Sequence, residues 1–374
     1  MILATPGPVE IPQFVREIFL QPAIHHRTSQ FKQILIEGLE RWKRLVNLPY
    51  GVFLSSSGTG AMEAVVLNLV KKGAVSVNGG KFGERWGKIC KAYSIPVQEI
   101  FYPWDTPANV AEVVDRVIAG AKEGKVDTLL LQLCESSGGV RHPVEKIAKE
   151  VKRERPEIVV VVDGITGVGV EPIDSRFIDV IIAGSQKAFM LPPGLAMVGF
   201  SQLGMERIGK GKGFYFNLAV ELKKQESGTT AFTPAVQHII AFNEVVKRWE
   251  KMGLDNYYRF TRLRHQGLKE GIRAIGLELY PQEPALAMVA VKMEGAEQFR
   301  RLLEEQFQIK VAGGQDHLKD KIFRINNMGL IPPNRLVYIL NSIELGLERV
   351  GVRSYTGDGI RAFSRYLFQN DNKK

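Results

Sequence analysis

Two runs of apolar residues decide the fold: "IVVVVDG" at residues 158–164 and "VIIAGSQKAFMLPPG" at residues 180–194. Both are rich in β-branched residues and show no alternation of apolar and polar positions, which is typical of strands buried on both faces of a parallel sheet. Asp163 ends the first strand, and Lys187 follows the second. Ligands of such sheets lie at the carboxyl ends of the strands, so these two residues are the first candidates for chemistry.

Similar apolar runs recur over the first two thirds of the chain. Short apolar runs such as "GVFLSS", "AVSVNG" and "TLLLQL" alternate with helical patterns. This alternation predicts an α/β fold in which helices cover both faces of a largely parallel sheet. A long helical stretch follows "GTTAFTPAV", and from about residue 270 the pattern becomes α+β. We therefore predict a large domain at residues 12–255 and a smaller α+β domain formed by residues 1–11 and 256–374.

The net charge of +10 on 374 residues is compatible with nucleic acid or with small anionic ligands. Lysine and arginine alternate with acidic residues in helical patterns such as "EKIAKEVKRERPE", and no basic stripe is interleaved with aromatic residues. The charge pattern therefore favours solvated helix faces over nucleic-acid binding.

The two cysteines, Cys90 and Cys134, belong to no CxxC or histidine-rich pattern, which argues against a disulfide framework and a zinc site. The first residues, "MILATPGPVEIP", do not form a secretory signal, and no run of 18 uncharged apolar residues follows. We expect a cytoplasmic protein that binds no metal, no membrane and no nucleic acid.

Two further strand ends carry candidate residues. "SSSGTGAMEAV" leads through Ser57, Gly58 and Thr59 into a helix, whose N-terminus suits a phosphate; a plain N-cap is the alternative for this turn alone. "VNGGKFGERWG" offers Phe82 and Trp86, either of which forms one face of a slot for a planar ring or packs in the core.

Asp163 and Lys187 also have ordinary alternatives. Asp163 is either a carboxylate paired with a buried cation or a helix N-cap, and Lys187 is either a desolvated nucleophile or a lysine whose ammonium reaches the surface. Their combination is more specific than either residue. A phosphate turn, an aromatic, a buried aspartate and, 24 residues later, a strand-end lysine are what a pyridoxal phosphate enzyme needs.

The chain resembles the class V aminotransferases of the fold type I pyridoxal phosphate enzymes, especially the alanine-glyoxylate and serine-pyruvate branch. The resemblance covers nearly the whole chain. Its motifs are "TPGPVEIP", "SGTGAMEA", "NGGKFGER", "ESSGG", "VVDGITGVGV", "GSQKAFMLPPGL", "TTAFTPAV" and "KIFRINNMG". It implies a large domain with a mostly parallel, mixed sheet, a smaller C-terminal domain, and pyridoxal 5'-phosphate as cofactor.

The resemblance also implies roles for individual residues. Lys187 would link covalently to the cofactor, and Asp163 would pair with its ring nitrogen. Phe82, where this branch often has tryptophan, would stack on the ring, and Ser136 would lie near the ring hydroxyl. The residues implied at the cofactor phosphate are Ser57, Gly58, Thr59 and Gln186, with Thr233 from the other subunit of a homodimer.

Substrate residues are implied in the same way. Arg324 would clamp the α-carboxylate, although "NNMG" follows it where relatives commonly have "GHMG". The small residues around Gly7 would favour glycine, alanine or serine as donor and glyoxylate or pyruvate as acceptor, with ping-pong kinetics. The pair His26-Arg27 either binds a distal anion, as in phosphoserine aminotransferases, or forms a basic surface loop.

Three other functions stay open in the sequence. A phosphoserine or aspartate aminotransferase is the main alternative. A lyase of the desulfurase kind would need a cysteine on a long flexible loop, whereas Cys90 falls in a helical pattern and Cys134 ends a strand-like run. A non-catalytic basic binding protein would explain the charge, but the presence of both Lys187 and Asp163 argues against it.

Overall fold

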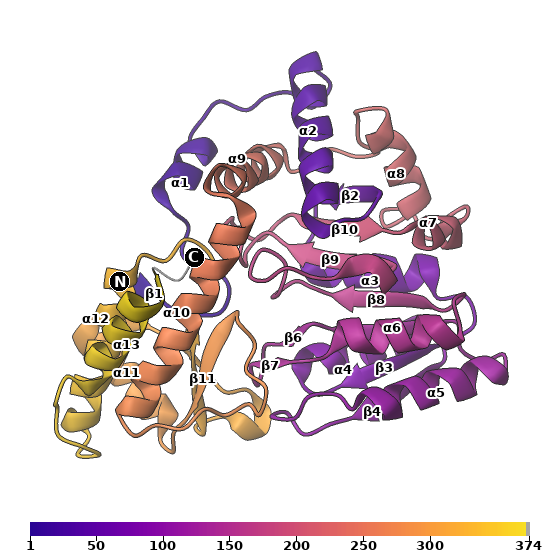
Figure 1. The fold of residues 1–374 in the computed structure, drawn as a ribbon. Helices are drawn as coiled ribbons and strands as arrows, with labels where there is room; N and C mark the ends of the chain where they lie inside the picture. Colours follow the sequence, from indigo (N-terminus) through magenta and orange to yellow (C-terminus); the bar gives the residue numbers. More distant parts are fainter. Residues whose placement is uncertain (372–374) are drawn as a thin grey trace.

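The computed structural model describes residues 1–371, and its centre is a mixed sheet with helices on both faces (Figure 1). Six strands run in one direction, and β10 is antiparallel to both of its neighbours. In spatial order the strands are β2 (Tyr50–Leu54), β10 (Ala196–Phe200), β9 (Val180–Gly184), β8 (Val159–Asp163), β5 (Thr128–Gln132), β3 (Ala74–Asn78) and β4 (Val97–Phe101). The prediction of an α/β fold with a mostly parallel sheet is confirmed.

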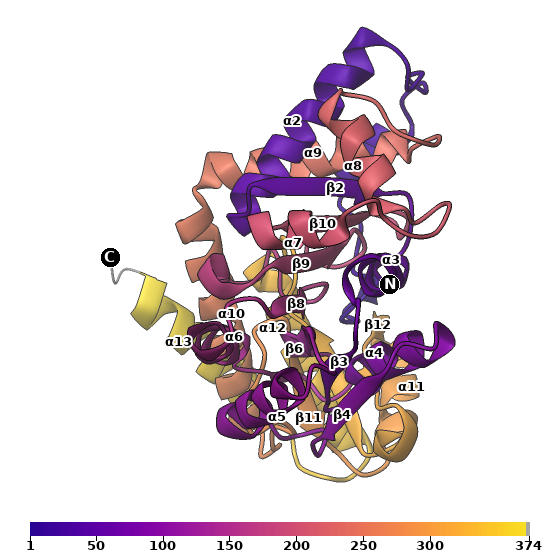
Figure 2. The ribbon, with the colours of Figure 1, turned by 90° about the vertical axis from the view of Figure 1, so that its right-hand side faces the viewer.

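Both faces of this sheet are buried, as the uninterrupted apolar runs predict. Along β8, Val160 and Val162 pack into one hydrophobic core and Val159 and Val161 into the other. Figures 1 and 2 show the helices that cover the two faces. One face carries α3 (Gly58–Leu69), α4 (Lys81–Ala92), α7 (Gln202–Ile208) and α8 (Leu218–Glu226). The other carries α2 (Ser29–Val46), α5 (Val110–Lys122), α6 (Val144–Glu154) and α9 (Val236–Met252), with α1 (Gln13–Phe19) packed on α9.

The long helical stretch after residue 235 is two helices, not one. Helix α9 ends at Met252, and α10 (Leu254–Ala274) begins after Gly253, whose φ of 79° lies in the left-handed region. A right-handed helix cannot pass through that conformation, so the chain bends there. Helix α10 then leads into the C-terminal part of the chain (Figure 1).

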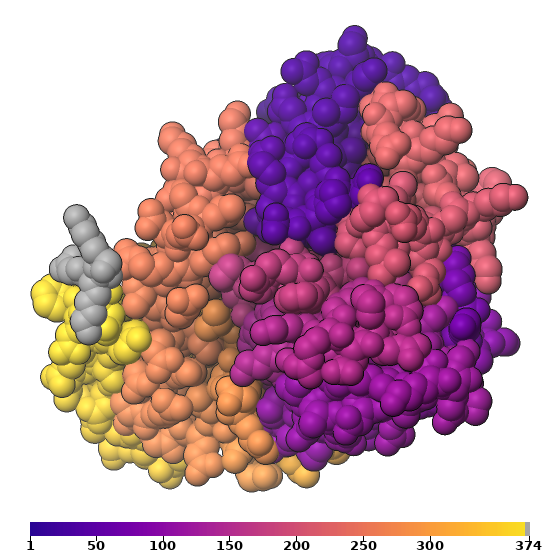
Figure 3. All heavy atoms as spheres, turned by 45° about the vertical axis from the view of Figure 1, so that its right-hand side comes forward, coloured from indigo at the N-terminus to yellow at the C-terminus, as the bar shows by residue number. Residues whose placement is uncertain are grey.

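The C-terminal part has its own hydrophobic core and lies along one side of the molecule (Figure 3). Its antiparallel sheet has the order β11 (Met288–Lys292), β14 (Ile322–Asn326), β13 (Ala312–Gly313). Its helices are α10, α11 (Ala296–Phe307), α12 (Pro333–Arg349) and α13 (Asp358–Asp371). The N-terminal strand β1 (Ile2–Leu3) pairs with β12 (Ile309–Lys310), which supports joining residues 1–11 to this part. The boundaries at residues 11 and 255 stay a prediction.

A short hairpin, β6 (Cys134–Glu135) and β7 (Val140–Arg141), follows β5. Short 3-10 helices lie at Ser175–Phe177 and Asp316–Leu318. None of the helices in residues 1–371 combines the length and the apolar character needed to cross a membrane.

Candidate active site

The carboxyl ends of three strands meet around the side chain of Ile165. Its backbone N–H donates a 2.8 Å hydrogen bond to Asp163 Oδ1 at the end of β8. Its side chain fills the space where a Cβ on Gly58 would lie, 2.4 Å from Ile165 Cδ1, and it also approaches Gly184 at the end of β9. The phosphate turn, the aspartate and the segment leading to Lys187 are therefore neighbours, as predicted from the sheet.

Lys187 lies in the turn after β9 and is 8% exposed. Its Nζ donates a 2.7 Å hydrogen bond to the carbonyl oxygen of Pro6. Burial lowers the pKa of Lys187 from 10.5 to about 8; Arg324 acts in the same direction, and Cys134 and Asp163 oppose it. The amine is thus closer to neutral, and more nucleophilic, than a surface lysine.

Gly7, on the N-terminal segment, lies directly against this lysine. A Cβ on Gly7 would lie 2.3 Å from Lys187 Nζ, and its φ of 117° disfavours any other residue. Val9 N donates to the carbonyl oxygen of Gln186, which anchors the segment beside the turn. The N-terminal segment therefore packs directly against the lysine amine.

Asp163 is 5% exposed, and burial raises its pKa from 3.8 to about 6. The hydrogen bond from Ile165 and the charges of Arg85 and Lys187 lower that pKa in opposition. A cation placed at this carboxylate would lower it further, since an opposite charge favours the ionised form. The carboxylate can thus hold a protonated ring nitrogen.

The N-terminus of α3 offers donors for an anion. Ser57 is exposed and caps the helix, its Oγ accepting from Gly60 N, and the first N–H groups of a helix have no partner within it. Near this turn Gln186 lies half-buried, and within residues 1–371 no hydrogen bond reaches its side-chain oxygen. Ser57, Gly58, Thr59 and Gln186 thus form a set that fits a phosphate.

Phe82 and Trp86 lie in different environments although both are on α4. Trp86 is fully buried in the core between α4 and the sheet, whereas Phe82 is half-buried. The Arg85 guanidinium lies 4.6 Å from the centre of the Phe82 ring. Phe82 is therefore the more accessible of the two aromatic residues, and its role at a bound ring stays a prediction.

Arg324 lies at the centre of β14 and is 7% exposed. It donates to the carbonyl oxygen of Ser136 and, at 3.1 and 2.6 Å, to that of Gly313. Three of its five N–H donors are used, so two remain for a carboxylate. Burial lowers the pKa of Arg324 to about 10, and the neighbouring charge of Glu135 opposes this effect.

Arg27 and Thr233 lie apart from these residues in the single chain. Both are exposed, Arg27 between α1 and α2 and Thr233 just before α9. None of the contacts among the described residues joins them to Lys187, Asp163 or Arg324. Thr233 was predicted to act from a second subunit, so its role and that of Arg27 stay predictions.

One residue of the site, Arg85, and one contact, that of Pro6 with Lys187, escaped the sequence reasoning. Arg85 donates a 2.9 Å hydrogen bond to Thr59 Oγ1 and lies over Phe82, so it ties the phosphate turn to the ring face. Its signal was the motif "NGGKFGER", in which only the aromatic residue was considered. Pro6 contributes a carbonyl oxygen to Lys187, and no side-chain chemistry in the sequence marks such a contact.

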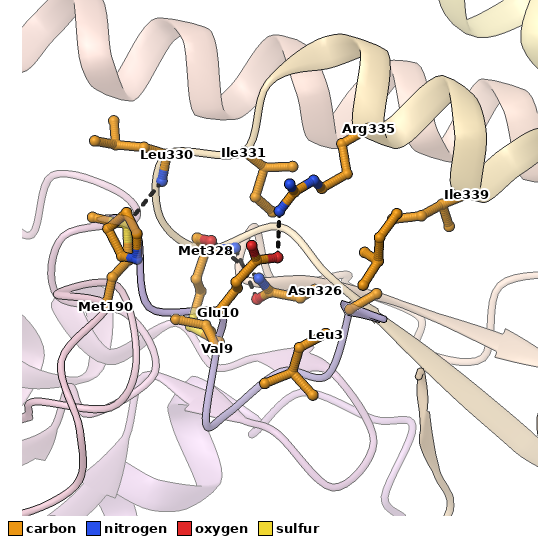
Figure 4. Close-up of a pocket in the computed structure, with 13 residues that line it drawn as sticks. Leu3, Val9, Glu10, Met190, Asn326, Met328, Leu330, Ile331, Arg335 and Ile339 are labelled. Carbon is orange, nitrogen blue, oxygen red and sulfur yellow. Dashed lines mark hydrogen bonds and ion pairs between the residues drawn. The ribbon is translucent and has the colours of Figure 1, made fainter. Parts of the chain in front are cut away.

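A cavity beneath the N-terminal segment is not the substrate site (Figure 4). It measures about 60 Å³, whereas ligand pockets are usually about 300–1,000 Å³. Its lining is mostly apolar, and an ion pair between Glu10 and Arg335 joins the segment to α12 beside it (Figure 4). Met190, three residues after Lys187, is one of its lining residues.

Cys90 and Cys134 are both free and buried, Cys90 in α4 and Cys134 in β6. Residues 1–371 contain no cluster of three histidine, cysteine or acidic side chains that could hold a metal ion.

The comparison with known proteins agrees with this geometry. The family model described as "Aminotransferase class-V" matches residues 13–328. The chain belongs to the class V aminotransferases. An uncharacterized aminotransferase of Helicobacter pylori (strain ATCC 700392 / 26695) is 44% identical over 98% of this chain and 100% of its own length. A serine–glyoxylate aminotransferase of Hyphomicrobium methylovorum is 26% identical over 99% of this chain and 95% of its own length.

A solved structure of a similar protein has the same fold. It is the aspartate aminotransferase of subgroup IV from Thermus thermophilus, which is 28% identical, covers 94% of this chain and 100% of its own, and superposes with a TM-score of 0.87. This protein is therefore a pyridoxal phosphate-dependent transaminase of fold type I. The residues at the strand ends fit that cofactor: a helix N-terminus for its phosphate, Asp163 for its ring nitrogen and Lys187 for its aldehyde carbon.

Proposed function

We propose that this class V aminotransferase transfers an amino group from alanine, serine or glycine to glyoxylate or pyruvate by a ping-pong mechanism. The observation that carries the proposal is the contact of Gly7 with Lys187: the covering segment approaches the amine so closely that little room remains for a substrate side chain. The name of the Hyphomicrobium relative supports a small donor and glyoxylate.

Each buried group has a task in this reaction. Bound pyridoxal phosphate supplies the electron sink that makes the α-proton of the amino acid acidic. Asp163, ionised near neutral pH, keeps a proton on the ring nitrogen by charge pairing. Arg324 binds the α-carboxylate with its two remaining donors and so orients the α-carbon. Lys187 Nζ, with its lowered pKa, removes the α-proton as general base.

Half-reactions test the substrate. The cofactor-loaded protein is mixed with alanine, serine, glycine, phosphoserine, aspartate or glutamate, and the loss of visible absorption from cofactor bound at Lys187 is followed. We expect the three small donors to react fastest, and Lys187→Ala to react with none. A preference for phosphoserine or aspartate would overturn the choice of donor and leave the chemistry intact.

A dicarboxylic or phosphorylated donor is the second candidate. The Thermus relative is named an aspartate aminotransferase, and the exposed Arg27 is a cation that a distal anion could reach in a dimer. Under this alternative Arg27→Ala raises the KM for aspartate and leaves that for alanine unchanged. An equal change in the KM for aspartate and the KM for alanine would instead indicate that Arg27 belongs to a basic surface loop and does not bind the distal anion.

The proposal includes a cytoplasmic homodimer in which Thr233 reaches the partner's phosphate turn. Aromatic side chains beside Thr233 are exposed in the single chain: Phe214 is 84% and Tyr215 44% accessible, and both contact Phe232. Mixing Lys187→Ala chains with Thr233→Arg chains tests the shared site. A hybrid dimer has one site with both residues intact, so the mixture regains activity that neither variant has; a mixture as inactive as its parts contradicts the shared site.

A further inference from the structure

Glu135 is a wholly buried carboxylate at the edge of the site, and none of the reaction steps above uses it. Its Oε2 accepts hydrogen bonds from the backbone N–H groups of Phe82, at 3.1 Å, and Gly83, at 2.8 Å. Its Oε1 accepts from the N–H of Ser137, at 3.1 Å, and from the Ser137 hydroxyl, at 2.6 Å. Burial raises the pKa of Glu135, and these four donors lower it in opposition.

This carboxylate replaces the N-cap that α4 lacks. The cap position is Gly80, which provides no side-chain hydrogen bond, and a Cβ there would lie 2.5 Å from the Glu135 carboxyl carbon. Lys81 N donates to Ser137 Oγ, so a third N–H of the first turn of the helix is bound by the same hairpin. A negative charge at a helix N-terminus is also favoured by the helix dipole.

The same contacts connect the residues expected around the cofactor ring. Phe82 is bonded to Glu135 through its backbone, Ser136 is the next residue after Glu135, and Arg324 donates to the carbonyl oxygen of Ser136. The carboxylate thus joins the start of α4 to the β6–β7 hairpin, and the hairpin in turn contacts β14 through the carbonyl oxygen of Ser136.

We propose that Glu135 is a positioning residue that orients the cofactor ring by holding Phe82 and Ser136 in fixed positions relative to each other. The inference rests on the assignment of those two residues to the ring. Glutamine at this position keeps the shape but loses the charge and replaces one acceptor oxygen with an amide donor. At least one buried backbone N–H then faces a donor, and the start of α4 shifts relative to Ser136.

The test uses the cofactor-loaded enzyme and its visible circular dichroism, which reports the fixed orientation of the ring independently of turnover. We expect Glu135→Gln to bind cofactor yet lose most of this signal, with kcat lowered roughly 10- to 100-fold, the scale of a misplacement of about 1 Å. Asn109→Ala removes the N-cap of α5 at an exposed position and controls for lost helix capping. It should keep the full signal.

Three outcomes would overturn the proposal or its basis. A Glu135→Gln enzyme with the wild-type signal, while Phe82→Ala loses it, refutes the role of Glu135 and leaves the site assignment intact. If Phe82→Ala also keeps the signal, the assignment of Phe82 fails. If Glu135→Gln does not fold, Ser137→Ala removes the 2.6 Å hydroxyl contact with Glu135 together with the acceptor of Lys81 N and should lose part of the signal; an unchanged signal there refutes the proposal.

Discussion

Replacing Gly7 with alanine tests the covering segment directly. The added Cβ would lie 2.3 Å from Lys187 Nζ and 2.7 Å from Cδ and Cε, whereas ordinary contacts begin near 3.4 Å. The lysine amine must therefore move by about 1.1 Å, the difference between 3.4 and 2.3 Å, or the segment must retreat by as much. A displacement of about 1 Å in a reacting group costs on the order of 100-fold in rate. That corresponds to about 2.7 kcal/mol of activation free energy.

The assay is the single-turnover rate with serine, followed by the loss of visible absorption of the bound cofactor. Gly124→Ala is the matched control, because Gly124 also has a left-handed φ, 69°, but nothing lies within 4 Å of an added Cβ. Both substitutions cost about 1–3 kcal/mol of folding free energy through backbone strain. Only Gly7→Ala should slow the half-reaction, and a folded Gly7→Ala protein that reacts within about threefold of the wild type, far short of the 100-fold loss, would refute the reasoning.

The other predictions concern the buried charges. Asp163→Asn should bind pyridoxal phosphate nearly as well as the wild type but lose about 10²- to 10³-fold in kcat, because the ring nitrogen loses its charge partner; steady-state rates and cofactor titration measure both. Arg324→Lys should raise the KM for the amino acid roughly 10- to 100-fold, because a single ammonium replaces the planar fork, and an unchanged KM would remove Arg324 from the carboxylate site. Apo protein should take up pyridoxal phosphate faster as the pH rises to about 8 and then level off, because the lowered pKa of Lys187 makes its amine neutral above that pH; a rate that still increases up to pH 10.5 would contradict the lowered pKa.

The strands that carry the site were predictable because their sequences fit a buried strand and few other local structures. β8 and β9 are rich in β-branched residues and have no alternation of apolar and polar positions. They are parallel neighbours, so Asp163 at the end of β8 and Lys187 after β9 lie at the same edge of the sheet. β4 is different: its residues are half-buried or exposed for the most part, so its composition resembles that of a surface segment. The direction of β10 is set by how the chain after Lys187 turns back; Pro192, Pro193 and Gly194 mark a turn there, but they do not show in which direction the next strand runs.

The same distinction separates the site residues that the sequence revealed from those it did not. Lys187 and Asp163 act through their own side chains at positions that the sheet dictates. Arg85 matters through Thr59 and Phe82, which come from different segments, and Pro6 matters through a backbone oxygen. The contact of Arg85 with Phe82 follows from their spacing of three residues on one helix. The contacts of Arg85 with Thr59 and of Pro6 with Lys187 join distant segments, so no period or spacing in a single sequence indicates them.

The charges around the site explain why the lysine can serve as a base. Lys187 and Arg324 are buried with Asp163 and Glu135, and Arg85 adds a third cation at the phosphate turn. With all of them ionised, three positive charges face two negative ones. Releasing the proton of Lys187 balances the set, so burial and the neighbouring arginines both favour the neutral amine that must attack the cofactor and later remove the α-proton. The lowered pKa of Lys187 thus comes first from burial and then from the positive charges of Arg324 and Arg85, which is why changing Arg324 should alter both carboxylate binding and the pH dependence of the lysine.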